Sequence, residues 1–366
     1  MQDPLRIAVV AHLRHPIAEP YMGGMEAHCA LLVRALIAAG HDVTLFASGD
    51  SAPDLPLHPI AAEAYEATLP WALWHGRREL SDWLDTAYAN AWRAIRDGAF
   101  DVVHNNSLSA PIHDWAARDG VPMVTSLHVP PFARLRDAVA ANPAPWMRLT
   151  VTSESQLPLW DGAADGRIAV AHNGIDLDRF RVGTDRHARA LWCGRITPTK
   201  GTREALVAAT AAGIALDLAG PVDCGTYFDE VSPLIASGHR YLGHLSGEAL
   251  AQRMGQAAML VCTPCWDEPF GLVAAEALAC GTPVVAFDRG ALREVVGDCG
   301  AVVASVADLA AAMRSVAGRV SPLACRARAE AMFGAPAMIA RYAESYAAAI
   351  AGARASSTAM TRAVLA

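Results

Sequence analysis

The stretch from Met259 to Phe287 reads MLVCTPCWDEPFGLVAAEALACGTPVVAF, and it predicts a strand, a loop, a helix and a second strand. The first apolar run stops at Pro264, and the second, 284–287, follows Cys-Gly-Thr-Pro at 280–283, which is a good helix stop. Apolar runs without alternation are typical of buried parallel strands, so we expect an α/β fold. Ligands of such sheets bind beyond the carboxyl ends of the strands, where helix amino termini favour anions. The loop 266–271 occupies that position.

Two carboxylates in this stretch need an explanation. Glu268 lies in the loop, and Glu276 is the only charged side chain between Gly271 and Cys280. At helical spacing Glu276 shares a face with apolar residues, and a carboxylate there must be solvated, paired or bound to a ligand, because burying it unpaired is costly. For Glu276 taken alone, a solvent-facing position on a surface helix is the ordinary alternative.

The two glutamates do not stand alone, since their frame EPFGLVAAEALACGTPVVA, a Glu-x7-Glu motif, resembles the donor site of retaining glycosyltransferases of family 4. The resemblance implies the GT-B fold, in which two Rossmann-like α/β domains face each other with their parallel sheets across an interdomain cleft. It also implies that Glu268 contacts the donor sugar hydroxyls and Glu276 the ribose diol of a nucleotide sugar. Backbone amides of Phe270, Gly271 and Leu272 would meet the sugar and the diphosphate.

Length and composition set bounds on these expectations. The 366 residues suffice for two domains, and the resemblance implies an N-terminal acceptor-side domain over 1–178 and a C-terminal donor domain over 179–339, with a last helix, about 340–366, packing back on the first. A net charge of −7 argues against nucleic acid as a partner. No apolar run reaches the length of a membrane span and no leader segment is recognisable, so the sequence predicts a cytoplasmic protein.

In the first half, Gly23 and Gly24 close a long loop before a helix expected over 26–39. Two glycines let a ligand approach the backbone, although a bare Gly-Gly is more often only a turn. The resemblance implies that this loop faces the donor phosphates. No Gly-x-Gly-x-x-Gly follows the first strand, which counts against a nicotinamide dehydrogenase. His128 ends a strand expected over 121–128. A lone histidine there is usually structural, but the resemblance assigns it as the active-site histidine near the reacting sugar carbon.

In the second half, Gly-Arg-Ile-Thr-Pro-Thr-Lys-Gly follows a strand at 190–193 and contains Arg195 and Lys200. Two solvated surface cations are the ordinary alternative, but the resemblance makes them a clamp on the diphosphate. It also implies that the nucleobase passes the backbone around Leu245. Asp-x-Asp at 176–178 could hold a metal, but its flanking residues match the family's domain junction, so no metal site is expected there. The Cys-x-x-Cys at 262–265 lacks further metal ligands nearby and fits small packing residues at a strand end better than a metal or redox site.

The sequence therefore predicts a retaining glycosyltransferase that moves a hexose-type sugar from a nucleotide sugar, most simply a UDP-sugar, to a glycan, a natural product or a lipid-linked acceptor. His128, Arg195, Lys200 and Glu268 are the predicted catalytic residues, and neither a metal nor another cofactor is expected. Two alternatives stay open: a nucleotide-sugar epimerase of the same architecture, and a non-catalytic nucleotide-sugar binding protein. A tryptophan- and arginine-containing region, 61–98, could serve as core or as a peripheral membrane contact, which a lipid-linked acceptor would require.

Overall fold

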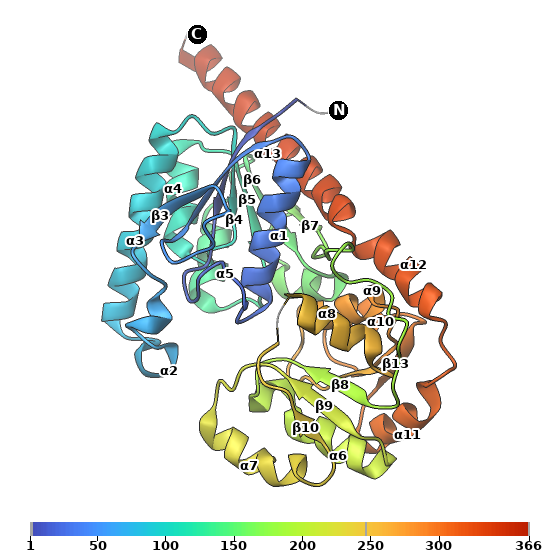
Figure 1. Cartoon of the computed structure of the whole chain (residues 1–366). Coiled ribbons are helices and arrows are strands. Elements are labelled where there is room, and N and C mark those ends of the chain that lie inside the picture. The colour runs from blue at the N-terminus through green and yellow to red at the C-terminus, as the bar shows by residue number, and fades with distance from the viewer. Residues whose placement is uncertain (1–2, 246, 365–366) are drawn as a thin grey trace. The chain divides into compact units, whose positions relative to one another are not determined.

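A computed structural model of the chain describes residues 3–245 and 247–364, which form two compact α/β units (Figure 1). Unit 1 comprises Met1–Ala171 and Met338–Ala366, and unit 2 comprises His172–Ala337. Each unit contains one parallel sheet, so the predicted fold class is confirmed. Unit 2 thus covers residues 172–337, whereas the sequence predicts a second domain over 179–339.

Unit 1 contains a seven-stranded sheet in the order β3-β2-β1-β4-β5-β6-β7. Its strands are β1 (Arg6–Val10), β2 (Asp42–Ser48), β3 (Leu57–Ala61), β4 (Val102–Asn105), β5 (Met123–Leu127), β6 (Met147–Val151) and β7 (Ile168–Val170). Its helices are α1 (Gly24–Ala38), η1 (Tyr65–Ala67), α2 (Trp71–Trp74), α3 (Arg78–Asp97), α4 (Ala110–Asp119), α5 (Ala133–Ala141), η2 (Glu154–Trp160) and most of α13 (Ala335–Val364).

The central strands of unit 1, β1, β4 and β5, are buried on both faces because helices cover each side of the sheet. In β1, Ile7 and Val9 belong to a core with α1 and α13, whereas Ala8 and Val10 belong to a core with α3 and α4. Figure 1 shows these two pairs of helices on opposite sides of the sheet. Side chains alternate between the faces of a strand, so both faces must be apolar and the run reads as continuously hydrophobic.

Unit 2 contains a six-stranded sheet in the order β10-β9-β8-β11-β12-β13. Its strands are β8 (Ala190–Cys193), β9 (Leu216–Ala219), β10 (Arg240–Tyr241), β11 (Leu260–Cys262), β12 (Val284–Phe287) and β13 (Gly300–Val303). Its helices are η3 (Pro198–Lys200), α6 (Thr202–Ala212), α7 (Gly225–Ile235), α8 (Gly247–Gln256), α9 (Leu272–Ala279), α10 (Leu292–Val296), α11 (Val306–Val316) and α12 (Pro322–Phe333). Helices α9 and α12 pack on one face, and α6 and α11 on the other.

The order of strands places a topological switch point in each unit. The chain reverses its direction of progress between β1 and β4 in unit 1, and between β8 and β11 in unit 2. Neighbouring connections leave such a point toward opposite faces of the sheet, which opens a ligand site beyond the carboxyl ends of the two strands. Residues following β1 and β4, and those following β8 and β11, are therefore the first places to look for function.

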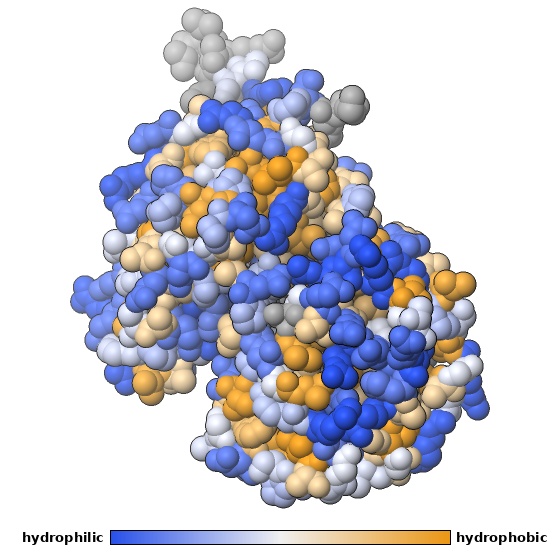
Figure 2. Space-filling view, viewed as in Figure 1, coloured by the Kyte–Doolittle hydropathy of each residue, from blue (hydrophilic) through white to orange (hydrophobic). Residues whose placement is uncertain are grey.

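The surface is largely hydrophilic with smaller apolar patches, as the visible face in Figure 2 shows. The exposed large apolar side chains include Trp71 on α2, Leu73 beside it, and Phe132 before α5. Within residues 3–245 and 247–364, no helix combines the length and the apolar character needed to cross a membrane.

Candidate active site

The switch point of unit 2 brings together two motifs that lie far apart in the sequence. The loop after β8 ends in η3 with Lys200, and the loop after β11 carries Trp266 and Glu268. The Nζ atom of Lys200 lies 2.7 Å from Oε2 of Glu268 and 5.3 Å from the centre of the Trp266 ring, while Trp266 Nε1 donates a hydrogen bond of 2.9 Å to the same Oε2. We call Lys200, Trp266 and Glu268 the unit 2 cluster.

The unit 2 cluster is partly enclosed, with about a quarter of the Lys200 side chain and 15% of the Glu268 side chain exposed. Both hydrogen bonds to Glu268 end on Oε2, and among the described residues Oε1 accepts none. The carboxylate is thus charge-balanced by an ammonium group and still has an oxygen available for a ligand hydroxyl.

Close packing of the two loops depends on Gly201, which follows Lys200. Its φ is +69°, and a Cβ atom there would lie 1.8 Å from the carbonyl oxygen of Thr263. The Thr263 hydroxyl donates a hydrogen bond of 2.7 Å to the Gly201 carbonyl. Only glycine meets both conditions without displacing the backbone, so the position of Lys200 is set by the residue after it.

Glu276 lies on α9, the helix that follows the loop with Glu268. Its side chain is buried, with 8% exposed, and no described residue donates a hydrogen bond to its carboxylate. Burial raises the pKa of Glu276 from 4.5 to about 7, and the charge of Arg179 offsets only part of this effect. A buried carboxylate without a hydrogen-bond donor is costly, and such groups concentrate at ligand sites.

Helix α9 begins directly after the loop. Gly271 has a φ of +85° and acts as its N-cap, Phe270 before it is buried, and Leu272 is the first helical residue. The first amides of a helix have no intrahelical acceptor and carry a partial positive charge. The start of α9 therefore offers N–H donors suited to an anion.

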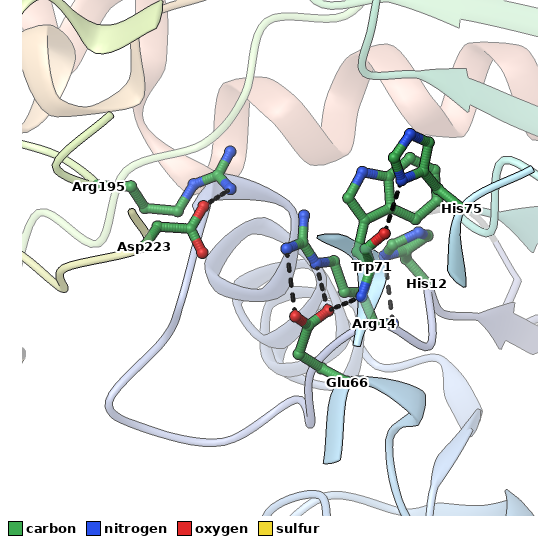
Figure 3. A network of polar contacts seen from close by, with 7 residues as sticks. All are labelled: His12, Arg14, Glu66, Trp71, His75, Arg195 and Asp223. Atoms are coloured by element: carbon green, nitrogen blue, oxygen red, sulfur yellow. Dashed lines mark hydrogen bonds and ion pairs between the residues drawn. The ribbon is translucent and has the colours of Figure 1, made fainter. Parts of the chain in front are cut away.

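Arg195 pairs with a carboxylate that does not belong to the unit 2 cluster. Its Nη1 atom lies 3.0 Å from Oδ2 of Asp223, in the turn after β9, as the left side of Figure 3 shows. Arg195 and Lys200, expected as one clamp, thus each pair with a carboxylate of their own. Leu245, expected near a nucleobase, packs partly buried against the core on the α9 side of the sheet.

His128 lies beside the switch point of unit 1, because it follows β5, the strand that pairs with β4. Its Nε2 atom lies 2.7 Å from Oδ1 of Asn106, the residue after β4, and its ring meets the His28 ring edge-on at 4.6 Å. Burial lowers the pKa of His128 to about 4, so the imidazole is neutral near pH 7. We call His28, Asn106 and His128 the unit 1 cluster.

The predicted glycine loop also belongs to unit 1. Gly23 is the N-cap of α1 and Gly24 its first residue, so the helix begins two residues before the expected start at 26. A Cβ atom on Gly23 would lie 3.1 Å from Oε2 of Glu26, which is itself buried in the first turn. A side chain at position 23 would therefore require this carboxylate to shift by a few tenths of an ångström.

A second polar network in unit 1 was not foreseen from the sequence. Nε of Arg14, in the loop after β1, lies 2.8 Å from Oε2 of Glu66, which also accepts the backbone N–H of Trp71 (Figure 3). The Trp71 ring stacks on His75 with ring centres 5.3 Å apart. These contacts fasten α2 to the loop that begins at the carboxyl end of β1.

No cluster of three or more histidine, cysteine, aspartate or glutamate side chains with metal-binding geometry occurs in the described part of the chain. Asp176 instead accepts the backbone N–H groups of Asp178 and Arg179, each at 3.1 Å, as a local cap. Cys262 is buried, Cys265 is exposed, and both are free thiols.

The side chains that contact the predicted site residues were not predicted from the sequence. Trp266, Asp223 and Asn106 contact Lys200, Arg195 and His128 respectively. The one available signal was position, because Asn106 directly follows a strand end and Trp266 opens the loop that contains Glu268.

Two family models match consecutive parts of the chain. Residues 22–179 match the model for glycosyltransferase family 4, and residues 188–318 match the model for glycosyl transferases group 1. Among curated relatives, the D-inositol 3-phosphate glycosyltransferase of Mycolicibacterium smegmatis is 31% identical over 384 residues, which cover 90% of this chain and 87% of the relative. A protein of the same name from Mycobacterium tuberculosis is 31% identical, covering 81% of this chain and 71% of that protein.

Solved structures share the fold over nearly the whole chain. The glycosyltransferase AviGT4 of avilamycin A biosynthesis is 25% identical with a TM-score of 0.74, covering 95% of this chain and 99% of its own. Sucrose-phosphate synthase from Thermosynechococcus elongatus has a TM-score of 0.74 at 22% identity, covering 93% of this chain and 98% of its own. The Anabaena protein HepE, solved with UDP and glucose, has a TM-score of 0.71 at 17% identity, covering 94% and 99%.

Proposed function

The chain belongs to glycosyltransferase family 4 and is a glycosyltransferase, and from this premise we propose that it transfers a hexose-type sugar from a nucleotide sugar to an acceptor with retention of configuration. The reaction would need neither a metal nor a resident cofactor, because the chain has cations of its own for the diphosphate. The donor would bind at the switch point of unit 2.

The observation that carries the proposal is the buried carboxylate of Glu276. Its pKa is raised to about 7 by burial, and no described side chain donates a hydrogen bond to it. A vicinal diol, such as that of a ribose, would supply two O–H donors at once and would make the ionised form favourable. A solvated surface glutamate, the ordinary alternative, does not fit a side chain that is 8% exposed.

The diphosphate would lie between the start of α9 and the cations of the loop after β8. Helix amides and Lys200 would stabilise the negative charge that develops on the leaving group as the glycosidic bond breaks. Arg195 would join them by exchanging its bond to Asp223 for a phosphate oxygen. Such groups act electrostatically, so a divalent ion would have no separate task.

The sugar would be oriented by Glu268 and by His128. Oε1 of Glu268 accepts no hydrogen bond among the described residues and could accept a sugar hydroxyl, while Lys200 Nζ holds the carboxylate in place through Oε2. We assign no covalent nucleophile. Retention would follow from reaction on one face of the sugar, with the departing phosphate taking the proton of the acceptor hydroxyl, in contrast to the paired carboxylates of retaining hydrolases.

The comparisons give the first substrates to test. The Anabaena protein of the same fold was solved with UDP and, in another structure, with UDP-glucose, which supports UDP-sugars as donors. The mycobacterial relatives are named for D-inositol 3-phosphate, which supports a polyol phosphate among the acceptors, and AviGT4 supports a natural product. Lipid-linked acceptors belong in the panel because Trp71 and Leu73 on α2 are both exposed.

The test is release of nucleoside diphosphate from UDP-, GDP-, ADP- and TDP-sugars, with and without EDTA, followed by mass spectrometry of the sugar product. We expect slow release from one donor without acceptor, faster release with the right acceptor, and no effect of EDTA. Conversion of the donor into an isomeric nucleotide sugar would identify an epimerase. Binding without turnover under every condition would identify a binding protein.

A further inference from the structure

Asn106 lies at the switch point of unit 1 with a fixed backbone. It follows the end of β4, and its N–H group donates a hydrogen bond of 2.8 Å to the carbonyl of Val10 in β1. Its side chain is 2% exposed and reaches across to His128, which follows the neighbouring strand β5. Two strand ends thus set the distance between the amide and the imidazole.

The contact between the two side chains determines where the imidazole proton lies. The Asn106 amide oxygen is 2.7 Å from Nε2 of His128, and an amide oxygen can only accept. Nε2 must therefore carry the hydrogen. In a neutral imidazole Nδ1 is then unprotonated and accepts hydrogen bonds, and the edge-on contact with His28 limits rotation of the ring.

Burial is what lowers the pKa of His128. The titratable groups around it are His12 after β1, His104 in β4 and His28 on α1, and burial lowers the pKa of all three as well. The cluster therefore contains no cation that would stand in for a protonated His128. What His128 can offer a substrate is a directed hydrogen bond.

The position of the Asn106 amide is energetically unfavourable for its NH₂ group. Its Nδ2 atom is buried and has no hydrogen-bond partner in the described part of the structure. An unsatisfied buried N–H group destabilises the folded state, so packing alone would favour an apolar residue here. Unsatisfied buried polar groups are rare in native structures, which sets Asn106 apart from an ordinary core residue.

We propose that Asn106 is a positioning residue that holds His128 as the Nε2–H tautomer and so presents Nδ1 as an acceptor for a hydroxyl of the sugar or of the acceptor substrate. The inference rests on the proposed role of His128 in sugar transfer. Turning the amide over would place its NH₂ group on Nε2 and move the imidazole proton to Nδ1, which is the opposite tautomer.

The matched control is Asn105, the preceding residue. It is also fully buried, but its amide bonds Thr125 and Ser107 and not His128. We compare Asn106→Ala, Asn106→Asp and Asn105→Ala with the wild-type chain, and ¹⁵N chemical shifts of the histidine rings report the tautomer, with the His128 signal assigned through His128→Gln.

We expect the Nε2–H tautomer in the wild-type chain and its loss in Asn106→Ala. In that variant kcat should be about 10- to 100-fold lower, which is the effect of a small misplacement of a reacting group. The KM for the donor should change little. Asn106→Asp keeps an accepting oxygen, so it should retain the tautomer. Its charge raises the pKa of His128, so activity should recover in alkaline solution while the acid limb of the pH–rate profile moves upward.

A wild-type Nδ1–H tautomer, an equal kcat loss in Asn105→Ala and Asn106→Ala, or an unshifted acid limb in Asn106→Asp would each overturn the proposal. The ring shifts are measured without substrate. If the wild-type chain cleaves no nucleotide sugar, the proposed function fails, while the tautomer is still decided by the spectra.

Discussion

Replacing Glu276 by glutamine should make the ligand-free protein more stable at alkaline pH and less able to bind a nucleotide. The wild-type carboxylate is buried on α9 without a hydrogen-bond donor among the described residues, and burial raises its pKa from 4.5 to about 7. Glutamine has nearly the same shape and no charge to bury, so the substitution removes the electrostatic penalty while it keeps the packing.

The size of the effect follows from the pKa of Glu276 in the two states. At about 1.4 kcal/mol for each pKa unit, raising it from 4.5 to about 7 means that ionisation of Glu276 costs the folded state about 3 kcal/mol. Below the unfolded pKa of 4.5 both states are protonated and the penalty is absent. It grows as the pH rises from there and is complete above about 7. The stability difference between Glu276→Gln and wild type should thus increase by about 2–3 kcal/mol from about pH 5 to about pH 8.

Urea unfolding of both proteins at the two pH values, with native-state hydrogen exchange of the α9 amides, measures this difference. A constant offset from the buried glutamine amide cancels, because only the change with pH is compared. Glu230→Gln, at an exposed position on α7, is the control and should show no such change. A difference between Glu276→Gln and wild type that is the same at both pH values would refute the reasoning.

The same variant tests the proposed ligand. If a ribose diol donates to the carboxylate, binding lowers the pKa of Glu276, and nucleotide binding below about pH 7 releases a proton that calorimetry in buffers of different ionisation enthalpy detects. Glu276→Gln should bind UDP more weakly and release fewer protons than wild type, because only the UDP phosphate can still lose one. A residue that serves ligand binding at a cost in stability should give a variant that is more stable and binds the ligand more weakly.

Other substitutions test the loops of unit 2. Lys200→Ala should lower kcat about 100-fold, because a preorganised charge on the leaving group is lost and Glu268 is left without its counter-ion; near wild-type turnover would exclude a catalytic role. Gly201→Ala should destabilise unit 2 by more than about 2 kcal/mol in urea, because its Cβ would meet the Thr263 carbonyl, whereas Gly213→Ala, at a similar φ of +71° with open space, should cost about 1 kcal/mol. Turnover should persist in EDTA, and its loss on chelation with recovery on adding Mg²⁺ would refute metal independence.

The parallel sheets were predictable because buried strands leave a direct record in the sequence. The expected strands at 284–287 and 190–193 coincide with β12 and β8. The two strands that were missed, β3 and β13, each lie at an edge of their sheet, and β3 also contains Pro59 and an exposed His58. Proline and polar residues are tolerated at an edge, where one side of the strand pairs with nothing, so β3 lacks the apolar signal.

The site was less predictable because its contacts depend on side-chain direction in turns. Lys200 and Glu268 are 68 positions apart, and their contact follows from the pairing of β8 with β11. Hydrophobic periodicity reports neither that adjacency nor the choice of Asp223 as the partner of Arg195. The burial of Glu276 was equally hidden, since an isolated glutamate on a helix has the same sequence whether it faces solvent or a ligand.

The pairing of charges in unit 2 has a consequence for how a donor would be recognised. Lys200 and Arg195 already have carboxylate partners, so a diphosphate gains only the difference between its own hydrogen bonds and those it replaces. Glu276 accepts no hydrogen bond from a described residue, so a diol that bonds it removes part of the cost of its burial without replacing another bond. In the proposed function, the contact between the nucleoside and Glu276 therefore supplies much of the selectivity among ligands, and the diphosphate fixes where the donor lies. Only a ligand that contains both groups can bond Glu276 while it occupies the start of α9.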